Sequence, residues 1–170
     1  MKGMPAAGYG DLPKLAVLTW GDAGAYLTSP VEGPEVTCVV SIGDVGDELP
    51  SGYHRVPHRL RLEFADVEHE WAGDLATADD IRKLIAFAGT IRTAGGTTVV
   101  HCRAAIGRSP AAAYILFAVL LGPGREADAL DAVLELRPFA QPNRWMVQLA
   151  DAELGRNGRL LGVLLERPRR

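Results

Sequence analysis

Short apolar stretches separated by Gly, Pro and Asp predict the strands of this chain. Residues 15–19 and 36–42 are apolar and rich in β-branched side chains, as buried strands are. Residues 97–100 form another short β-branched run. In residues 59–64 the apolar side chains occupy every second position, which places them on one face of a strand: Leu60, Leu62 and Phe64. We expect these four segments to be strands of one sheet.

Apolar residues at helical spacing predict an amphipathic helix in the middle of the chain. Thr77 and Asp80 have the spacing of a capping box, with Asp in place of the usual Glu. The apolar positions that follow recur every three or four residues: Ile81, Leu84, Ile85, Ala88 and Ile91. Gly95 and Gly96 are expected to end this helix, because glycine is a poor helix former.

The last third of the chain is predicted to be helical. One helix begins at Ser109, and its apolar run at 111–121 is much shorter than the roughly 20 residues of a membrane span. A second helix covers 125–136, where apolar residues form one stripe. A third follows Asn143, a good N-cap residue, and an Asn-Gly pair interrupts it before 160–165.

Strands that are followed mostly by helices indicate an α/β fold. The chain has no internal repeat, no low-complexity tract and no long linker. We therefore predict a single domain over residues 1–170, in which helices flank a central, mostly parallel β-sheet. Residues 1–12 contain several Gly and Pro and are expected to be loose.

Composition and charge are those of an ordinary globular protein. Of the 170 residues 48% are hydrophobic, and the net charge of −3 offers no electrostatic surface for nucleic acid. The basic tail, Arg167, Arg169 and Arg170, is expected to be solvated. Gly and Pro interrupt the N-terminus where a signal peptide would be apolar. Cys38 and Cys102 are too few for a disulfide framework and lack metal-ligand spacing. These features predict a cytoplasmic protein without membrane contact.

Residues 99–110 combine a strand, a tight loop and a helix start. The loop lies between Cys102 and Arg108, and its backbone N–H groups can surround one tetrahedral dianion at the positive end of a helix dipole. These are the N–H groups of Arg103, Ala104, Ala105, Ile106 and Gly107. Arg108 supplies a planar guanidinium that binds two phosphate oxygens at once. Because the same positive groups favour a thiolate, the segment predicts a phosphate-binding loop above the nucleophilic sulfur of Cys102.

This segment resembles the HCx5R(S/T) signature of the cysteine-dependent protein tyrosine and dual-specificity phosphatases. The signature residues here are His101, Cys102, Arg108 and Ser109. The chain length, the mid-chain site and the helical last third resemble the compact dual-specificity-like branch. The resemblance implies that Cys102 attacks phosphorus to give a cysteinyl-phosphate, and that Arg108 binds substrate and transition state. It further implies that Ser109 donates to the leaving sulfur, that His101 orders the loop, and that no metal or other cofactor takes part.

The resemblance also implies an upstream aspartic acid that protonates the leaving group. Asp66 is the candidate, because it continues the face of strand 59–64 and because Phe-Ala-Asp-Val resembles the acid-bearing loop of small phosphatases. Three rival aspartates have simpler explanations as a polar loop or a helix start: Asp74, Asp79 and Asp80. Gln141 or Asn143 is a candidate for orienting the hydrolytic water, although capping already explains Asn143.

One loop position departs from the family pattern, which has glycine where this chain has Ala105. A Cβ there restricts the backbone or crowds the phosphate, so a phospho-ligand binding module without turnover is an alternative to an enzyme. Three other residues are interpreted structurally. Cys38 is expected in the core rather than as a redox partner, Arg103 in solvent rather than as a second charge for polyanionic substrates, and Trp71 as a loop anchor rather than a cleft wall.

The leading prediction is a phosphatase that hydrolyses phosphate monoesters, phosphotyrosine foremost, with dual specificity as an extension. Its expected partner is a phosphorylated protein or a small phosphate monoester, and neither nucleic acid nor a membrane. Phosphoinositides, nucleotides and RNA 5′ ends are alternative substrates. Arsenate reduction and sulfur transfer are alternative reactions. The sequence carries no signal for the oligomeric state.

Overall fold

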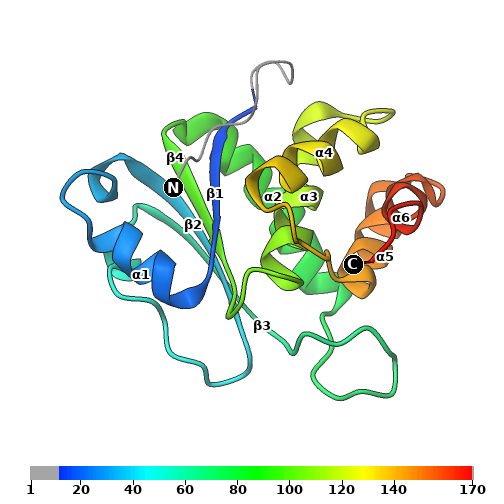
Figure 1. Cartoon of the computed structure of the whole chain (residues 1–170), viewed down its shortest axis with the longest axis horizontal. Coiled ribbons are helices and arrows are strands. Elements are labelled where there is room, and N and C mark those ends of the chain that lie inside the picture. Colours follow the sequence, from blue (N-terminus) through cyan, green and yellow to red (C-terminus); the bar gives the residue numbers. More distant parts are fainter. Residues whose placement is uncertain (1–11, 170) are drawn as a thin grey trace.

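A four-stranded parallel sheet forms the centre of the computed structural model, which describes residues 12–169 (Figure 1). Its strands are β1 (Lys14–Leu18), β2 (Val36–Gly43), β3 (His58–Glu63) and β4 (Thr97–His101). They lie in the order β1-β4-β2-β3, and each neighbouring pair is parallel. The predicted α/β fold with a mostly parallel sheet is therefore confirmed. The N-terminal segment 1–12 was predicted to be loose, but its residues 1–11 lie outside the described part of the chain.

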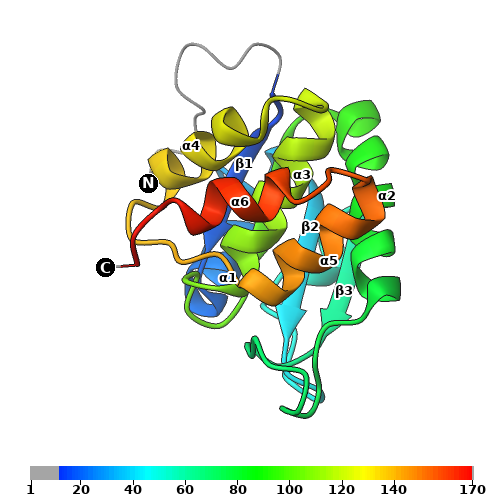
Figure 2. The same cartoon turned by 90° about the vertical axis from the view of Figure 1, so that its right-hand side faces the viewer.

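Helices cover both faces of the sheet. On one face lies α1 (Trp20–Thr28). The short 3₁₀ helices η1 (Gly33–Glu35) and η2 (Tyr53–Arg55) come before and after β2. Figure 2 shows the thicker layer on the other face: α2 (Ala78–Ala94), α3 (Arg108–Leu121), α4 (Glu126–Leu136), α5 (Arg144–Leu154) and α6 (Arg159–Leu165). Two hydrophobic clusters, one on each side of the sheet, form the core.

Helix α3 is the central helix of the thicker layer. Its residues are buried from Arg108 to Ala118, which agrees with the apolar run in its sequence. The hydroxyl of Tyr114 donates a hydrogen bond of 2.8 Å to the carbonyl of Leu160, which joins α3 to α6. Because α3 begins directly after the loop 102–107, the core fixes where that loop ends. Among residues 12–169, no helix has the length and apolarity that crossing a bilayer requires.

The structure corrects the prediction at the start of the chain. The first strand ends at Leu18 rather than at Thr19, because the Thr19 side chain accepts a hydrogen bond of 3.1 Å from the Asp22 N–H and caps α1. Helix α1 was not predicted, since its two glycines weaken the helical pattern. The second strand extends to Gly43, and the predicted capping box at Thr77 is present.

The described part of the basic tail is exposed, as expected, and its arginines also form ion pairs: Arg167 with Asp131 of α4, and Arg169 with Glu68. The expectation for Trp71 is wrong. Trp71 does not anchor its loop. Its side chain is 86% exposed, and its ring stacks on that of His69.

Candidate active site

The phosphate-binding loop predicted at residues 102–108 lies at the carboxyl edge of the sheet, where β4 ends and α3 begins. Cys102 follows β4 directly and is 2% exposed. Its Sγ accepts a hydrogen bond of 3.3 Å from the Ala105 N–H and lies 3.2 Å from the Ser109 hydroxyl. The loop therefore turns its backbone toward the sulfur, as the sequence pattern predicts.

Ala105 adopts a left-handed backbone conformation, with φ of 55°. This is the position at which the family pattern has glycine, and a non-glycine residue there carries strain of roughly 1–2 kcal/mol. The Ala105 side chain is 1% exposed and packs into the main hydrophobic core. The chain therefore accommodates the Cβ by packing it inward, and the loop keeps its turn.

The Arg108 guanidinium is buried and held from one side. Its Nη1 donates to Oδ1 of Asp44 and to the carbonyl oxygen of Phe64, both at 2.6 Å. The Arg108 residue is 4% exposed, yet its buried Nε has no hydrogen-bond partner in the described structure. A buried N–H without an acceptor costs about 1–3 kcal/mol, so this edge of the guanidinium is suited to an anionic ligand.

Asp44 was missed by the sequence analysis, although a signal for it exists. It follows the end of β2 directly, and polar residues at the carboxyl ends of parallel strands meet at one edge of the sheet. Its carboxylate is half exposed, whereas the Arg108 side chain that it pairs with is nearly fully buried.

Asp66 packs directly on the loop. A Cβ built on Gly107 would lie 2.7 Å from Oδ1 of Asp66, so only glycine allows this approach. The Asn143 side-chain amide donates a hydrogen bond of 2.8 Å to the same Oδ1, and the Asn143 N–H donates to the Gly107 carbonyl. Asn143 also caps α5 by accepting from the Met146 N–H at 3.0 Å. The capping role assigned from sequence is therefore correct, but it is only part of what this residue does.

The rival aspartates have structural roles away from the loop. Asp79 forms ion pairs with Arg82 and Lys83 on the exposed face of α2. Asp80 completes the capping box of the same helix. Asp74 lies in a turn with φ of 57°, and its carbonyl accepts from the Ala65 N–H. Of the four candidates, the structure brings Asp66 to the loop.

His101 is buried behind Cys102 in a chain of hydrogen bonds. Its Nδ1 lies 3.2 Å from the Cys102 carbonyl oxygen, and its Nε2 lies 2.7 Å from Oγ of Ser41. Burial lowers the pKa of His101 to about 4, which keeps the ring neutral. Because a carbonyl only accepts, Nδ1 must carry the proton, and Nε2 then accepts from the Ser41 hydroxyl. Nη1 of Arg61 donates to the same hydroxyl at 2.8 Å, and this supports the assignment because arginine can only donate.

No family model matches the sequence, and no curated protein matches it. Solved structures do. Human DUSP28 is 20% identical with a TM-score of 0.59 over 85% of this chain and 93% of its own. DUSP15 is 22% identical with a TM-score of 0.61 over 99% and 96%. PTPMT1, solved in complex with PI(5)P, is 14% identical with a TM-score of 0.58 over 89% and 94%. The chain has the fold of the dual-specificity phosphatases. The resemblance seen in the signature segment is thereby confirmed for the fold.

Within this dual-specificity-phosphatase fold, a cavity of about 390 Å³ lies beside the loop. Trp20 forms part of its wall and is fixed through its ring N–H, which donates to the Glu48 carbonyl at 3.0 Å. Arg103 is exposed, as expected, but it also donates to Oδ1 of Asp47 at 3.2 Å. Asp44 and Asp47 therefore each hold one arginine of the loop.

The other residues singled out from the sequence differ in how far they are buried. Ile106 is 49% exposed, and its carbonyl accepts a hydrogen bond of 2.8 Å from the Gln141 N–H, so residues 141–143 brace the loop through their backbone. Ala104 is exposed. Cys38 is fully buried on β2 and pairs in register with Thr98, at the far end of β4 from Cys102. Its predicted place in the core is correct.

Proposed function

We propose that this protein is a cysteine-dependent phosphatase that hydrolyses phosphate monoesters, phosphotyrosine foremost, through a cysteinyl-phosphate. The observation that carries the proposal is the buried Arg108 Nε, which has no acceptor, in the same loop as an N–H aimed at the Cys102 sulfur. An arginine at the first position of a helix opposes the helix dipole, and a bound anion removes that conflict. A phosphate dianion in this loop would accept from the Arg108 Nε and would offset the conflict with the helix dipole.

In the first step the Cys102 thiolate attacks phosphorus while the bond from phosphorus to the leaving oxygen breaks. The negative charge spreads over the three equatorial oxygens, where the loop N–H groups and Arg108 stabilise it. Asp66 gives its proton to the leaving oxygen. The Asn143 amide donates to one carboxyl oxygen, which leaves the other free to carry that proton.

In the second step water attacks the cysteinyl-phosphate, and the bond between phosphorus and sulfur breaks. Asp66, now ionised, accepts the proton of the attacking water. The Ser109 hydroxyl, 3.2 Å from Sγ, donates to the sulfur as it regains negative charge. His101 is a positioning residue and takes no part in the bond changes. Its Nδ1–H donates to the Cys102 carbonyl and holds the nucleophile in place.

The proposal also names a class of substrate. Phosphotyrosine is our choice, and the complex of PTPMT1 with PI(5)P makes a phosphoinositide the alternative. A binding module without turnover is less favoured, since Ala105 keeps its N–H directed at the sulfur. Both cysteines are free thiols, as the cytoplasmic location that we propose requires.

The test is an aryl phosphate assay in the presence of a chelator. We expect hydrolysis by the wild-type protein and none by Cys102→Ser, which keeps the loop but replaces the nucleophile with a poor one. Cys38→Ser is the matched control, because it removes the other thiol, and it should keep activity. Turnover that survives in Cys102→Ser would refute the covalent mechanism. Phosphopeptides and phosphoinositides assayed side by side then decide the substrate class.

A further inference from the structure

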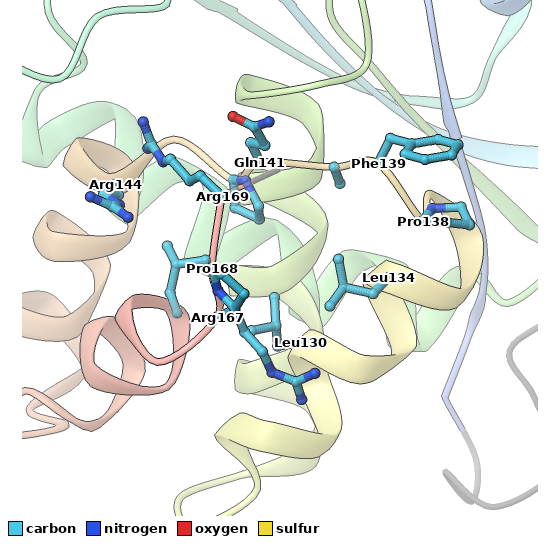
Figure 3. Close-up of a pocket in the computed structure, with 12 residues that line it drawn as sticks. Leu130, Leu134, Pro138, Phe139, Gln141, Arg144, Arg167, Pro168 and Arg169 are labelled. Carbon is cyan, nitrogen blue, oxygen red and sulfur yellow. The ribbon is translucent and has the colours of Figure 1, made fainter.

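A groove of about 380 Å³ lies next to the proposed active site, between α4, the segment 137–143 and the chain that follows α6 (Figure 3). Its apolar wall includes Leu130, Leu134 and Pro138. Phe139, at its edge, is 79% exposed, although aromatic side chains of soluble proteins are usually covered. The groove therefore offers an open apolar surface to a ligand.

The polar part of the groove is cationic. Arg144, Arg167 and Arg169 line it, and none of the described lining residues is acidic. Arg167 and Arg169 each pair with a carboxylate, and these side chains are 41–46% exposed apart from Glu68 at 25%. Exposed pairs of this kind contribute about 1 kcal/mol or less, so an incoming carboxylate can exchange with the protein's own. Charge complementarity points to an acidic ligand.

One end of the groove lies beside the proposed active site. Its lining includes Gln141, whose N–H donates to the Ile106 carbonyl of the phosphate-binding loop. Figure 3 places Gln141 and Arg169 at one end of the groove and Arg167 at the other. A chain that leaves the phosphate-binding loop over Ile106 can therefore run along it.

We infer that this groove binds an acidic and apolar segment of a phosphorylated protein substrate, next in sequence to the phosphorylated residue. The inference rests on the proposed phosphatase function and adds a substrate preference to it. Apolar side chains of the segment pack on Leu130 and Leu134, and its carboxylates pair with Arg167 and Arg169. A peptide suits this groove better than a membrane does, because three separate segments line the groove and make it a hollow, which a flat bilayer cannot enter.

The first experiment compares matched phosphotyrosine peptides. One carries alternating Glu and Leu on one side of the phosphotyrosine, a second carries them on the other side, and two controls replace Glu by Lys or Leu by Ser. We expect one of the first two to have a kcat/KM about fivefold or more above both controls, since rim charges and small apolar contacts act at this scale. p-Nitrophenyl phosphate, which does not reach the groove, serves as the reference substrate.

The second experiment changes the groove in opposite directions. Arg167→Glu should lower kcat/KM for the preferred peptide about fivefold, whereas Asp131→Asn, which releases Arg167 from its ion pair, should raise it about twofold. Both variants should hydrolyse p-nitrophenyl phosphate at the wild-type rate. Both positions are on the surface, so neither change is expected to affect folding.

The outcomes separate the groove from the phosphatase. If the peptides are hydrolysed equally well and both variants behave as wild type, the groove inference is wrong and the phosphatase stands. If nothing is hydrolysed, fluorescence anisotropy with the unphosphorylated Glu-Leu peptide still decides: binding that Arg167→Glu abolishes supports the groove, and no binding overturns it. Arg167-dependent binding to phosphatidylserine vesicles, without discrimination among peptides, would overturn the inference in favour of a membrane surface.

Discussion

The phosphate-binding loop and the loop that carries Asp66 are held in the fold in different ways. Cys102 and Ala105 are almost fully buried, and the Ala105 N–H and the Ser109 hydroxyl contact the Cys102 sulfur from within or next to the loop, while the Gln141 and Asn143 N–H groups bond to loop carbonyls from outside it. Residues 64–77, in contrast, contain neither helix nor strand. Long-range contacts hold them: the Asn143 amide binds Asp66, Arg169 and the Arg144 N–H bind Glu68, and the Trp145 ring N–H binds the Ala76 carbonyl.

This difference assigns separate tasks to the two loops. A loop whose sulfur and turn are buried and whose backbone is hydrogen-bonded from two sides suits the binding of an anion, because its donors are already in position. A loop held by a few side chains can adjust to leaving groups of different size while Asp66 stays within reach of the leaving oxygen. Changes in the first loop should therefore affect phosphate binding and turnover together, and changes around the second should affect turnover alone.

Among changes that keep the nucleophile, the largest effect should come from Arg108→Lys. Lysine keeps the charge but cannot donate hydrogen bonds to Asp44, the Phe64 carbonyl and two phosphate oxygens at once. We expect kcat/KM for an aryl phosphate to fall by about 10²–10³-fold, with weaker inhibition by inorganic phosphate. Arg103→Lys, an exposed arginine of the same loop, is the control and should stay within about threefold of wild type. Similar losses of kcat/KM in both variants would mean that Arg108 contributes no more to catalysis than an exposed arginine of the same loop.

Stability should depend on pH through His101. Its pKa is about 4 in the folded protein and about 6.5 when unfolded, so the unfolded chain takes up the proton first as pH falls. The stabilisation is complete above pH 6.5 and is lost as pH falls toward 4. Urea unfolding should give a free energy about 2 kcal/mol lower at pH 5 than at pH 7. His101→Gln should lose most of this dependence, and an equal slope in that variant would assign it to other groups.

Asn143→Ser should weaken the acid loop alone. Serine still caps α5 but is too short to hold Asp66, so we expect kcat for an alkyl phosphate, a poor leaving group, to fall about tenfold with KM unchanged. p-Nitrophenyl phosphate should be hydrolysed almost normally. Asp66→Asn should lower kcat for the alkyl phosphate by at least about 10²-fold and remove the basic limb of its pH profile. In that background, Asn143→Ser should have no further effect on kcat. Additive losses would place the two residues in separate roles.

The smallest effect should come from Ala105→Gly. Relief of the left-handed strain, roughly 1–2 kcal/mol, is offset by the loss of one buried methyl, about 0.8 kcal/mol, and by the greater freedom of the unfolded chain. We expect the free energy of unfolding to change by less than about 0.5 kcal/mol. Ala104→Gly, without positive φ, should lose about 0.5–1 kcal/mol. A larger loss at position 105 than at position 104 would show that the alanine carries no strain.

The same contrast explains what the sequence could predict. The sheet, helices α2 to α6 and the loop from Cys102 to Arg108 follow from local patterns, because their spacing and caps lie within short segments. Helix α1 has two glycines in nine residues and gives no such pattern.

Partners far apart in sequence were harder to predict. Asp44 meets Arg108 because β2 and β4 end at a common edge of the sheet, whereas Asn143 meets Asp66 across 77 residues because the start of α5 packs against the loop that follows β3. The Ser41 and Arg61 side chains behind His101 were missed for the same reason: they lie on neighbouring strands whose register a sequence does not state.

A rapid-quench experiment tests the central claim most directly. The wild-type protein is mixed with an aryl phosphate, stopped with acid within the first turnover and digested, and mass spectrometry locates the bound phosphate. The account predicts a phosphate on the Cys102 sulfur that forms no more slowly than turnover, and none in Cys102→Ser. Hydrolysis without any phosphorylated cysteine, or with the phosphate on another residue, would contradict it.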